Sequence, residues 1–256
     1  LPWVRHMRHL HTQVSAHFYQ RPLTCITRPP APTRGSGPSE PEPGDVVLCW
    51  NRYGGAAEQA DHFERHGARV LVAENCPLGN SLHGGAYSLA RSHVAVTGGG
   101  VASGGPERWD SWGINLAPYR GDAGETVILG QRGIGHPDVA SPAQWAEQMR
   151  GRIGGRIRAH PGTGEAVPLV DDLARAGAVI TWSSAAALQA MALGVPVWHA
   201  HPKFIGAPAA RPLADWPGPG KCDAAARLEV FRRLAWAIWS LEEISSGEAV
   251  AKVLEQ

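Results

Sequence analysis

The chain has 256 residues, of which 43% are hydrophobic and 18% are charged, so it is long enough for one large or two small domains and too short for three. No apolar run reaches the roughly 18 residues that a membrane span needs, which excludes an integral membrane protein. The formal net charge is +1, so no overall basic field attracts nucleic acid.

The cysteines and the N-terminal composition favour a cytoplasmic protein. No CxxC spacing occurs, which argues against both a disulfide scaffold and a cysteine zinc site. The start of the chain shows no apolar segment of signal-peptide type. The cysteines are Cys25, Cys49, Cys76 and Cys222.

Residues 1–44 are predicted to be an N-terminal extension followed by a proline-rich linker. Residues 1–20 have the composition of a short solvated helix, and six prolines fall between Arg28 and Pro43. A metal site on that helix is the less favoured alternative, because no acidic partner follows its histidines. These histidines are His6, His9, His11 and His17. We expect regular structure to start at Asp45.

Residues 45–124 are predicted to form a first Rossmann-like domain. Two apolar strands flank a segment with helical spacing, which predicts a parallel βαβ unit with a right-handed crossover. The predicted elements are a strand at Val46–Trp50, a helix at Ala56–His66 closed by Gly67, a strand at Arg69–Ala73 and a third strand at His93–Thr97.

Residues 125–223 are predicted to form a second doubly wound domain, because strands and helices alternate throughout. Residues 224–256 should pack back across both domains, starting with a helix at Ala224–Trp239. The expected fold is therefore α/β, with two small Rossmann-like domains and a cleft between them. The predicted strands are Thr126–Gly130, Arg156–His160, Ala178–Trp182 and Val195–His199; the helices are one capped by Ser141 with Pro142 first and ending at Arg150, one at Pro168–Ala176, and one capped by Ser183 that runs to Leu193 and is closed by Gly194.

Polar groups follow three strands of the second series, at the sheet edge where open α/β folds bind ligands. The helix after the third of these strands opens with two serines and small residues, so an anion can approach its N-terminus. Together the three segments predict a phosphate or diphosphate site. The alternatives are that Ser183 is only a helix cap and that His160 is a packed strand-end histidine. The predicted phosphate ligands are Gln131, Arg132, Gly133, Arg158, His160, Ser183 and Ser184.

Two segments carry a resemblance to a known family. The first contains three motifs in order: Arg158-x-His160-Pro-Gly, Pro168-Leu-x-Asp-Asp-Leu and a serine-bearing helix starting Trp182-Ser-Ser-Ala. It resembles the donor domain of GT-B glycosyltransferases, in particular the group related to capsule polysaccharide and Kdo transferases and their bacteriophage-encoded counterparts. Val72-Ala-Glu-Asn75 resembles the acceptor-side motif of that group. The resemblance covers residues 45–247 and is specific over 156–199.

The resemblance implies the chemistry of sugar transfer from a nucleotide donor, UDP- or CMP-linked. It implies that the His-Pro turn and the serine-bearing helix hold the donor phosphates, and that transfer proceeds without a metal or other cofactor; no DxD motif occurs in the sequence. Glu74 is the preferred base for the acceptor hydroxyl and Asp110 the second choice, although Glu74 could instead be a structural carboxylate that holds the Asn75 turn. With His160 at the leaving phosphate, these are the catalytic candidates. The acceptor-side candidates are Asn51, Tyr53, Asn75, Trp109 and Trp112.

The acceptor is left open between a saccharide and a hydroxymethylated pyrimidine in phage DNA. Arg150 and Arg152 lie in a local arginine cluster and are the candidates for contacts with DNA phosphates. A sugar-nucleotide epimerase would need carboxylates beside the donor, for which only Asp171 and Asp172 qualify in this part of the chain. A non-catalytic nucleotide-sugar binding module is the third alternative.

Overall fold

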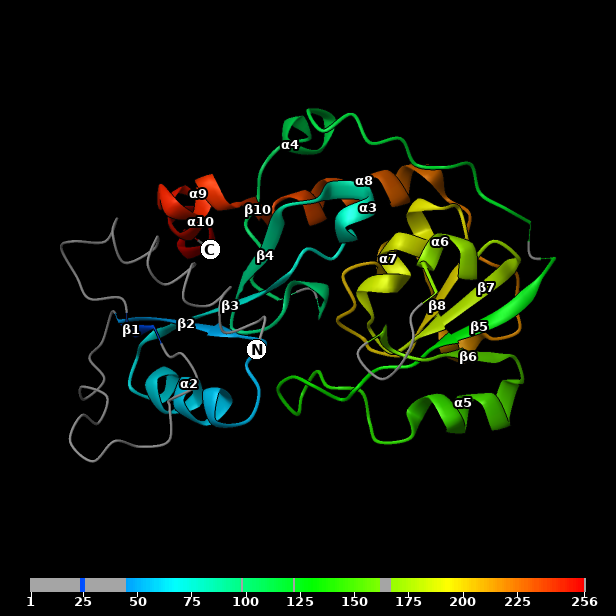
Figure 1. Ribbon diagram of the computed structural model, residues 1–256, viewed down its shortest axis with the longest axis horizontal. Coiled ribbons are helices and arrows are strands. Elements are labelled where there is room, and N and C mark those ends of the chain that lie inside the picture. The colour runs from blue at the N-terminus through cyan, green and yellow to red at the C-terminus, as the bar shows by residue number, and fades with distance from the viewer. Residues whose placement is uncertain (1–23, 26–44, 98, 122, 162–166, 256) are drawn as a thin grey trace.

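In the computed structural model, the strands form two five-stranded sheets within the described residues, which are 24–25, 45–97, 99–121, 123–161 and 167–255. One sheet lies on the left of Figure 1 and the other on the right, and α8 extends from the second sheet to the first. The helices are α2 (Gly55–Arg65), α3 (Gly79–His83), α4 (Glu107–Asp110), α5 (Trp145–Ile153), α6 (Leu169–Asp172), α7 (Ala185–Ala192), α8 (Ala224–Ala235), α9 (Leu241–Ser245) and α10 (Glu248–Leu254), with 3-10 turns η1 (Ala95–Thr97), η3 (Ala207–Ala209) and η4 (Leu213–Asp215).

The first sheet is mixed. Its order is β1-β2-β3-β4-β10, in which β1, β2 and β3 are parallel while β4 is antiparallel to both of its neighbours. The predicted β2–α2–β3 unit is confirmed, and Gly67 takes φ +86° after α2, a left-handed conformation that ends the helix at little steric cost. The strands are β1 (Thr24–Cys25), β2 (Val46–Trp50), β3 (Arg69–Asn75), β4 (Ala86–Arg91) and β10 (Ile238–Ser240).

Three expectations for this half of the chain are wrong. Regular structure does not start at Asp45, because β1, which precedes Asp45 in the chain, already pairs with β2. Residues 93–97 contain the turn η1 instead of a strand, and the third strand in sequence after Asp45 is β4, which contacts β3 in antiparallel register. The long terminal helix stops at Ala235, after which β10 pairs with β4. The helix predicted at residues 1–20, with its histidines, lies outside the described residues.

The second sheet is parallel throughout, as the alternating pattern predicts. Its order is β6-β5-β7-β8-β9, so successive connections move in opposite directions from β5. Such a reversal is the point at which ligands bind in open α/β sheets. The strands are β5 (Glu125–Leu129), β6 (Arg156–Arg158), β7 (Ala176–Thr181), β8 (Val197–His199) and β9 (Arg211–Pro212).

The helix starts in this half differ from the prediction. Ser141 is buried and does not cap α5, which begins at Trp145 after Gln144 in a left-handed conformation. Residues 168–176 contain only the short α6 and then enter β7. The hydroxyl that caps α7 belongs to Ser184 instead of Ser183.

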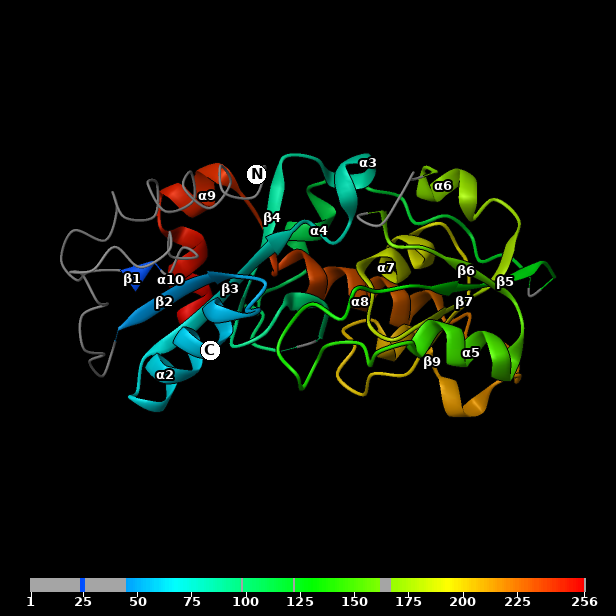
Figure 2. The ribbon, with the colours of Figure 1, turned by 60° about the horizontal axis from the view of Figure 1, so that its bottom comes forward.

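One apolar core is shared between the two sheets. It combines Leu78 and Ala90 from the first half with Val127 and Val179 from the second, and Phe231 of α8 is fully buried in it. Figure 2 shows α8 along the middle of the molecule, with β4 on one side and β7 on the other. The two sheets are thus joined by packed side chains as well as by the chain. No helix among the described residues has the length and apolarity to cross a membrane.

Candidate functional site

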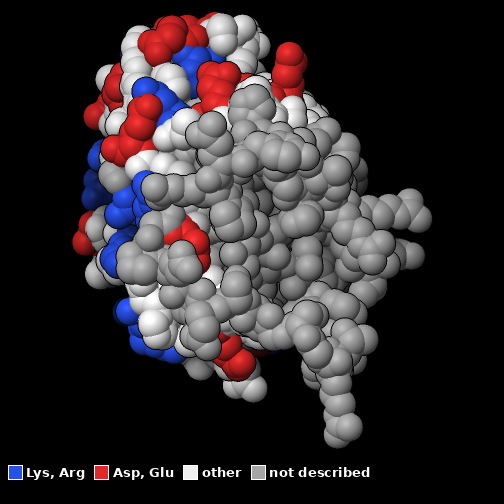
Figure 3. All heavy atoms as spheres, turned by 90° about the vertical axis from the view of Figure 1, so that its left-hand side faces the viewer, with Lys and Arg blue, Asp and Glu red and all other residues white. Residues whose placement is uncertain are grey.

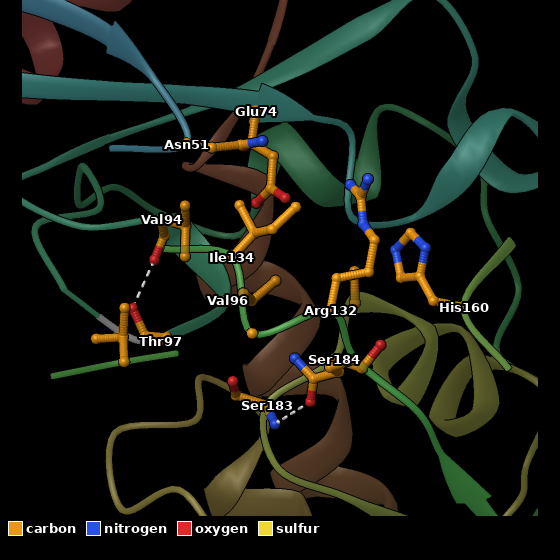
Figure 4. A pocket seen from close by; sticks show the side chains of 14 residues that line it. Asn51, Glu74, Val94, Val96, Thr97, Arg132, Ile134, His160, Ser183 and Ser184 are labelled. Carbon is orange, nitrogen blue, oxygen red and sulfur yellow. Dashed lines mark hydrogen bonds between the residues drawn. The ribbon is translucent and has the colours of Figure 1, made fainter. Parts of the chain in front are cut away.

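A cavity opens where the loops after β5 and β7 meet. It encloses about 710 Å³, open solvent included, and both halves of the chain contribute side chains to it. Its place at the reversal of the second sheet explains why loop residues converge there. Figure 4 shows the residues that line it: Asn51, Glu74, Val94, Val96, Thr97, Gln131, Arg132, Gly133, Ile134, Val139, His160, Ser183, Ser184 and Ala185.

Arg132 provides a cation in this cavity. Its side chain extends between Glu74 and His160 (Figure 4), and the structure gives it no ion pair with any described residue. Gly133 follows with φ +64°, and a Cβ there would come within 3.1 Å of the Ser141 carbonyl oxygen, so glycine allows this turn. An arginine without a protein carboxylate is available to bind an anion from solution.

His160 faces Arg132 from the loop after β6. Burial lowers the pKa of His160, and the charge of Arg132 lowers it further. The imidazole is therefore neutral at pH 7, so it acts toward a ligand as a hydrogen-bonding group and adds no second positive charge.

The N-terminus of α7 lines the opposite side of the cavity. Its first N–H groups are largely satisfied within the protein: the Ser183 N–H donates to Gln131 Oε1 (3.0 Å), the Ser184 N–H to Thr181 Oγ1 (2.9 Å) and the Ala186 N–H to Ser184 Oγ (3.2 Å). These three amides are therefore not free to bind an anion. The helix dipole and the Ser183 hydroxyl remain as groups that favour an anion.

Glu74 enters the cavity from the first sheet, near the end of β3. Burial raises its pKa to about 7, and the nearby positive charge of Arg132 opposes that rise. In Figure 4 its carboxylate points toward the cavity from the strand above. A carboxyl group with a pKa near 7 is divided between its two protonation states at neutral pH, which suits a group that accepts a proton.

Asn51 stands beside Glu74, in the turn after β2. Its side-chain oxygen is buried and has no hydrogen-bond partner among the described residues. Its backbone φ is +60° and that of the following Arg52 is +40°. Leaving a buried polar atom unpaired costs about 1–3 kcal/mol, so the position marks a place where a ligand can supply the partner.

Several predicted site residues are not brought to this cavity. Arg158 pairs with Asp172 and donates to the Val167 carbonyl oxygen (2.8 Å), so its guanidinium serves the protein. Asp110 lies on α4, where its carboxylate is 3.3 Å from Nη2 of Arg232.

The acceptor-side aromatic residues are also elsewhere. Trp109 is only 3% exposed and packs in the shared core against Phe231, with the ring centroids 5.1 Å apart. Trp112 stacks on His83 at 4.0 Å. Tyr53 is exposed and does not line the cavity, and neither does Asn75, which is exposed at the end of β3.

The arginine cluster near α5 is divided by its partners. Arg156 pairs with Glu125 (3.0 Å) and with Asp172 (2.8 Å), which is also the partner of Arg158. Arg150 and Arg152 lie exposed in the last turn of α5, outside the cavity lining. Two cations are thus available on this surface instead of four.

The apolar part of the lining escaped prediction from the sequence. Val94, Val96 and Thr97 come from the turn that was expected to be a strand, and Ile134 and Val139 from the loop after β5. Thr97 donates its hydroxyl to the Val94 carbonyl oxygen (2.7 Å), which holds this wall in shape. In the sequence, only their position after predicted strands, next to polar residues, indicates that they could line a cavity.

The described residues contain no cluster of three or more His, Cys, Asp or Glu side chains that could hold a metal ion. No protein-family model matches the chain, and no curated protein matches it.

Among solved structures, two KpsC transferases from Thermosulfurimonas dismutans are similar to the chain. The β-Kdo 2,7 transferase has a TM-score of 0.47 and 14% identity, covering 82% of this chain and 86% of its own. The β-Kdo 2,4 transferase has a TM-score of 0.45 and 16% identity, covering 75% and 78%. Likeness at this level does not assign a function to the chain.

Proposed function

We propose that the chain is a GT-B-type glycosyltransferase that moves a sugar from a nucleotide-sugar donor to a hydroxyl acceptor. The observation that carries the proposal is that one cavity holds both Glu74, whose pKa is about 7, and Arg132, which forms no ion pair with any described residue. A base and an anion-binding cation on opposite halves of a cavity are what transfer from a phosphate leaving group requires. The sequence motifs around His160 and Ser183 support the same chemistry.

In the proposed reaction, the acceptor oxygen attacks the anomeric carbon of the sugar. The bond from that carbon to the phosphate oxygen breaks, and its electron pair stays on the departing UDP or CMP. The acceptor proton moves to the Glu74 carboxylate. Arg132, the neutral imidazole of His160 and the dipole of α7 stabilise the negative charge that grows on the phosphate. This mechanism asks for no metal, because these groups supply the positive field.

A saccharide acceptor is favoured over hydroxymethylated DNA. Of the four clustered arginines, Arg156 and Arg158 are neutralised by carboxylates, and the two others lie outside the cavity lining. On the face shown in Figure 3, basic and acidic side chains are interspersed over the described residues, so that face does not present one sign of charge to a phosphate backbone. An epimerase is less favoured because Asp172 is held by two arginines away from the cavity.

A transfer assay tests the proposal. The protein is incubated with UDP- and CMP-sugars and either oligosaccharides or hydroxymethylated duplex DNA, with and without EDTA, and the products are identified by mass spectrometry. We expect a sugar mass added to an oligosaccharide and release of the free nucleotide, unaffected by EDTA. Sugar added only to DNA would reverse the choice of acceptor, and activity that EDTA removes and Mn²⁺ restores would contradict the metal-free mechanism. Donor binding without turnover on any acceptor would favour the binding module.

A further inference from the structure

The turn after β2 carries backbone strain directly beside the cavity. Asn51 and Arg52 both have positive φ, at +60° and +40°, and neither is glycine. A positive φ is uncommon for a residue other than glycine and persists only where the surroundings hold it in place. The question is what holds this turn, and for what purpose.

The guanidinium of Arg52 holds the turn after β2 in place. The side chain is 5% exposed, and its Nη2 lies 2.6 Å from Asp61 Oδ1 and 2.5 Å from Glu64 Oε2, both on α2. Its Nη1 donates to the Ser92 carbonyl oxygen (2.6 Å), just after β4. Three separate anchors on two elements therefore fix the conformation of this turn.

The two carboxylate anchors have further contacts. The Ser92 hydroxyl donates to Glu64 Oε1 (2.9 Å), so the carboxylate that receives Arg52 is fixed from a second direction. Asp61 Oδ2 lies 3.9 Å from Nε2 of His136, which belongs to the same loop as Arg132. The network thus connects the turn after β2 with the loop after β5, and both of these segments supply residues that line the cavity.

We propose that Arg52 is a positioning residue that presents the Asn51 side-chain oxygen to a second hydroxyl of the acceptor, next to the hydroxyl that Glu74 deprotonates. The inference rests on the proposed function. Arg52 itself does not line the cavity, whereas Asn51 does, with a buried side-chain oxygen that lacks a partner among the described residues. A non-reacting hydroxyl of the acceptor is a donor of suitable chemistry for that oxygen, while the reacting hydroxyl gives its own proton to the adjacent Glu74 in the transfer step. The distorted turn is then the means by which this oxygen reaches the cavity.

The test separates positioning from general stability by kinetics in a double-mutant cycle. Arg52→Lys keeps the charge but cannot reach three anchors with one planar fork, so the Asn51 side chain loses its fixed position. Asn51→Gly removes the amide while keeping a residue that adopts φ +60° freely. Because one hydrogen bond to the acceptor is lost in each, we expect the acceptor KM to rise about 3- to 10-fold with kcat changed less than about 2-fold. The donor Kd should stay at the parent value.

The double variant decides the matter. If Arg52 acts through Asn51, adding Arg52→Lys to Asn51→Gly should raise the acceptor KM no further. Arg108→Lys is the matched control: Arg108 is 13% exposed, pairs with Glu243 (2.5 Å) and donates to two carbonyl oxygens away from the cavity. It should lower the melting temperature and leave the acceptor KM unchanged.

Two results would overturn the inference alone while the parent enzyme transfers sugar. One is an Arg52→Lys protein with the parent's acceptor KM, and the other is a KM effect of Arg52→Lys that persists in full in the Asn51→Gly background. A parent protein that transfers no sugar to any acceptor would overturn the proposed function and this inference with it.

Discussion

Glu74 carries a free-energy cost that depends on pH. Burial raises its pKa from 4.5 to about 7, so the folded protein holds this proton more tightly than the unfolded chain does. The stabilisation of the folded protein that comes from binding this proton is complete below pH 4.5 and is lost as the pH rises through 7. At pH 8 the free energy of unfolding of Glu74→Gln should therefore exceed that of the parent by up to about 3 kcal/mol, and this difference should disappear toward pH 4.5. Urea unfolding at both pH values measures it; an advantage that is the same at both would contradict the raised pKa.

Arg132 and Glu74 should be coupled even without substrate. The charge of Arg132 lowers the pKa of Glu74, partly opposing the effect of burial. Arg132→Met should therefore move the Glu74 titration above 7, while Arg150→Met, which removes an exposed arginine outside the cavity lining, should leave it in place. Carbon-13 NMR of the Glu74 carboxyl group follows the titration directly. An identical titration in both variants would show that Arg132 does not face Glu74.

At the scale of elements, the cap of α7 connects stability to the cavity. Ser184 accepts the Ala186 N–H, whereas the Ser183 hydroxyl has no partner among the described residues. Ser184→Ala should therefore lower the free energy of unfolding by about 1 kcal/mol, and Ser183→Ala by clearly less. Thermal unfolding of the two variants gives the comparison, and the reverse order would return the cap to Ser183.

The elements that local signals specify were predictable from the sequence. The β2–α2–β3 unit and the parallel second sheet follow from apolar runs, helical spacing and left-handed glycines such as Gly67 and Gly194. β4, the antiparallel partner of β3, was not predicted, and neither was β10, which is defined by pairing with β4 across about 150 residues of chain instead of by its own pattern. The same limit explains the missed start of α5, where buried Ser141 donates locally and Gln144 makes the turn.

For the candidate site, the sequence could place groups at strand ends but could not choose between ligand and protein as their partner. Arg132 lies in the loop after β5 and Arg158 is the last residue of β6 in the same sheet, and only the fold shows that Asp172 is the partner of Arg158. Trp109 likewise is of a residue type that stacks on sugars, yet its ring packs in the core. Charge pairing and burial are properties of the assembled chain, which a pattern of residue types does not contain.

At the scale of the whole molecule, the shared core predicts one cooperative unfolding transition. Leu78 is fully buried among residues of both halves, so neither sheet can unfold without exposing apolar surface of the other. Calorimetry should give a single peak whose van't Hoff and calorimetric enthalpies agree. Leu78→Ala should lower the stability by about 2–5 kcal/mol without splitting the peak. Two resolved transitions would show that the halves fold independently.

The central claim is that the cavity divides donor binding from catalysis between its two walls, and Glu74→Gln tests it most directly. Gln keeps the shape and hydrogen bonding of Glu74 but cannot accept the acceptor proton. Calorimetric titration with the nucleotide-sugar donor should give a Kd within a few-fold of the parent, while turnover of the same preparation falls by about 10²–10⁴-fold. A variant that loses donor binding, or one that remains fully active, would contradict the account.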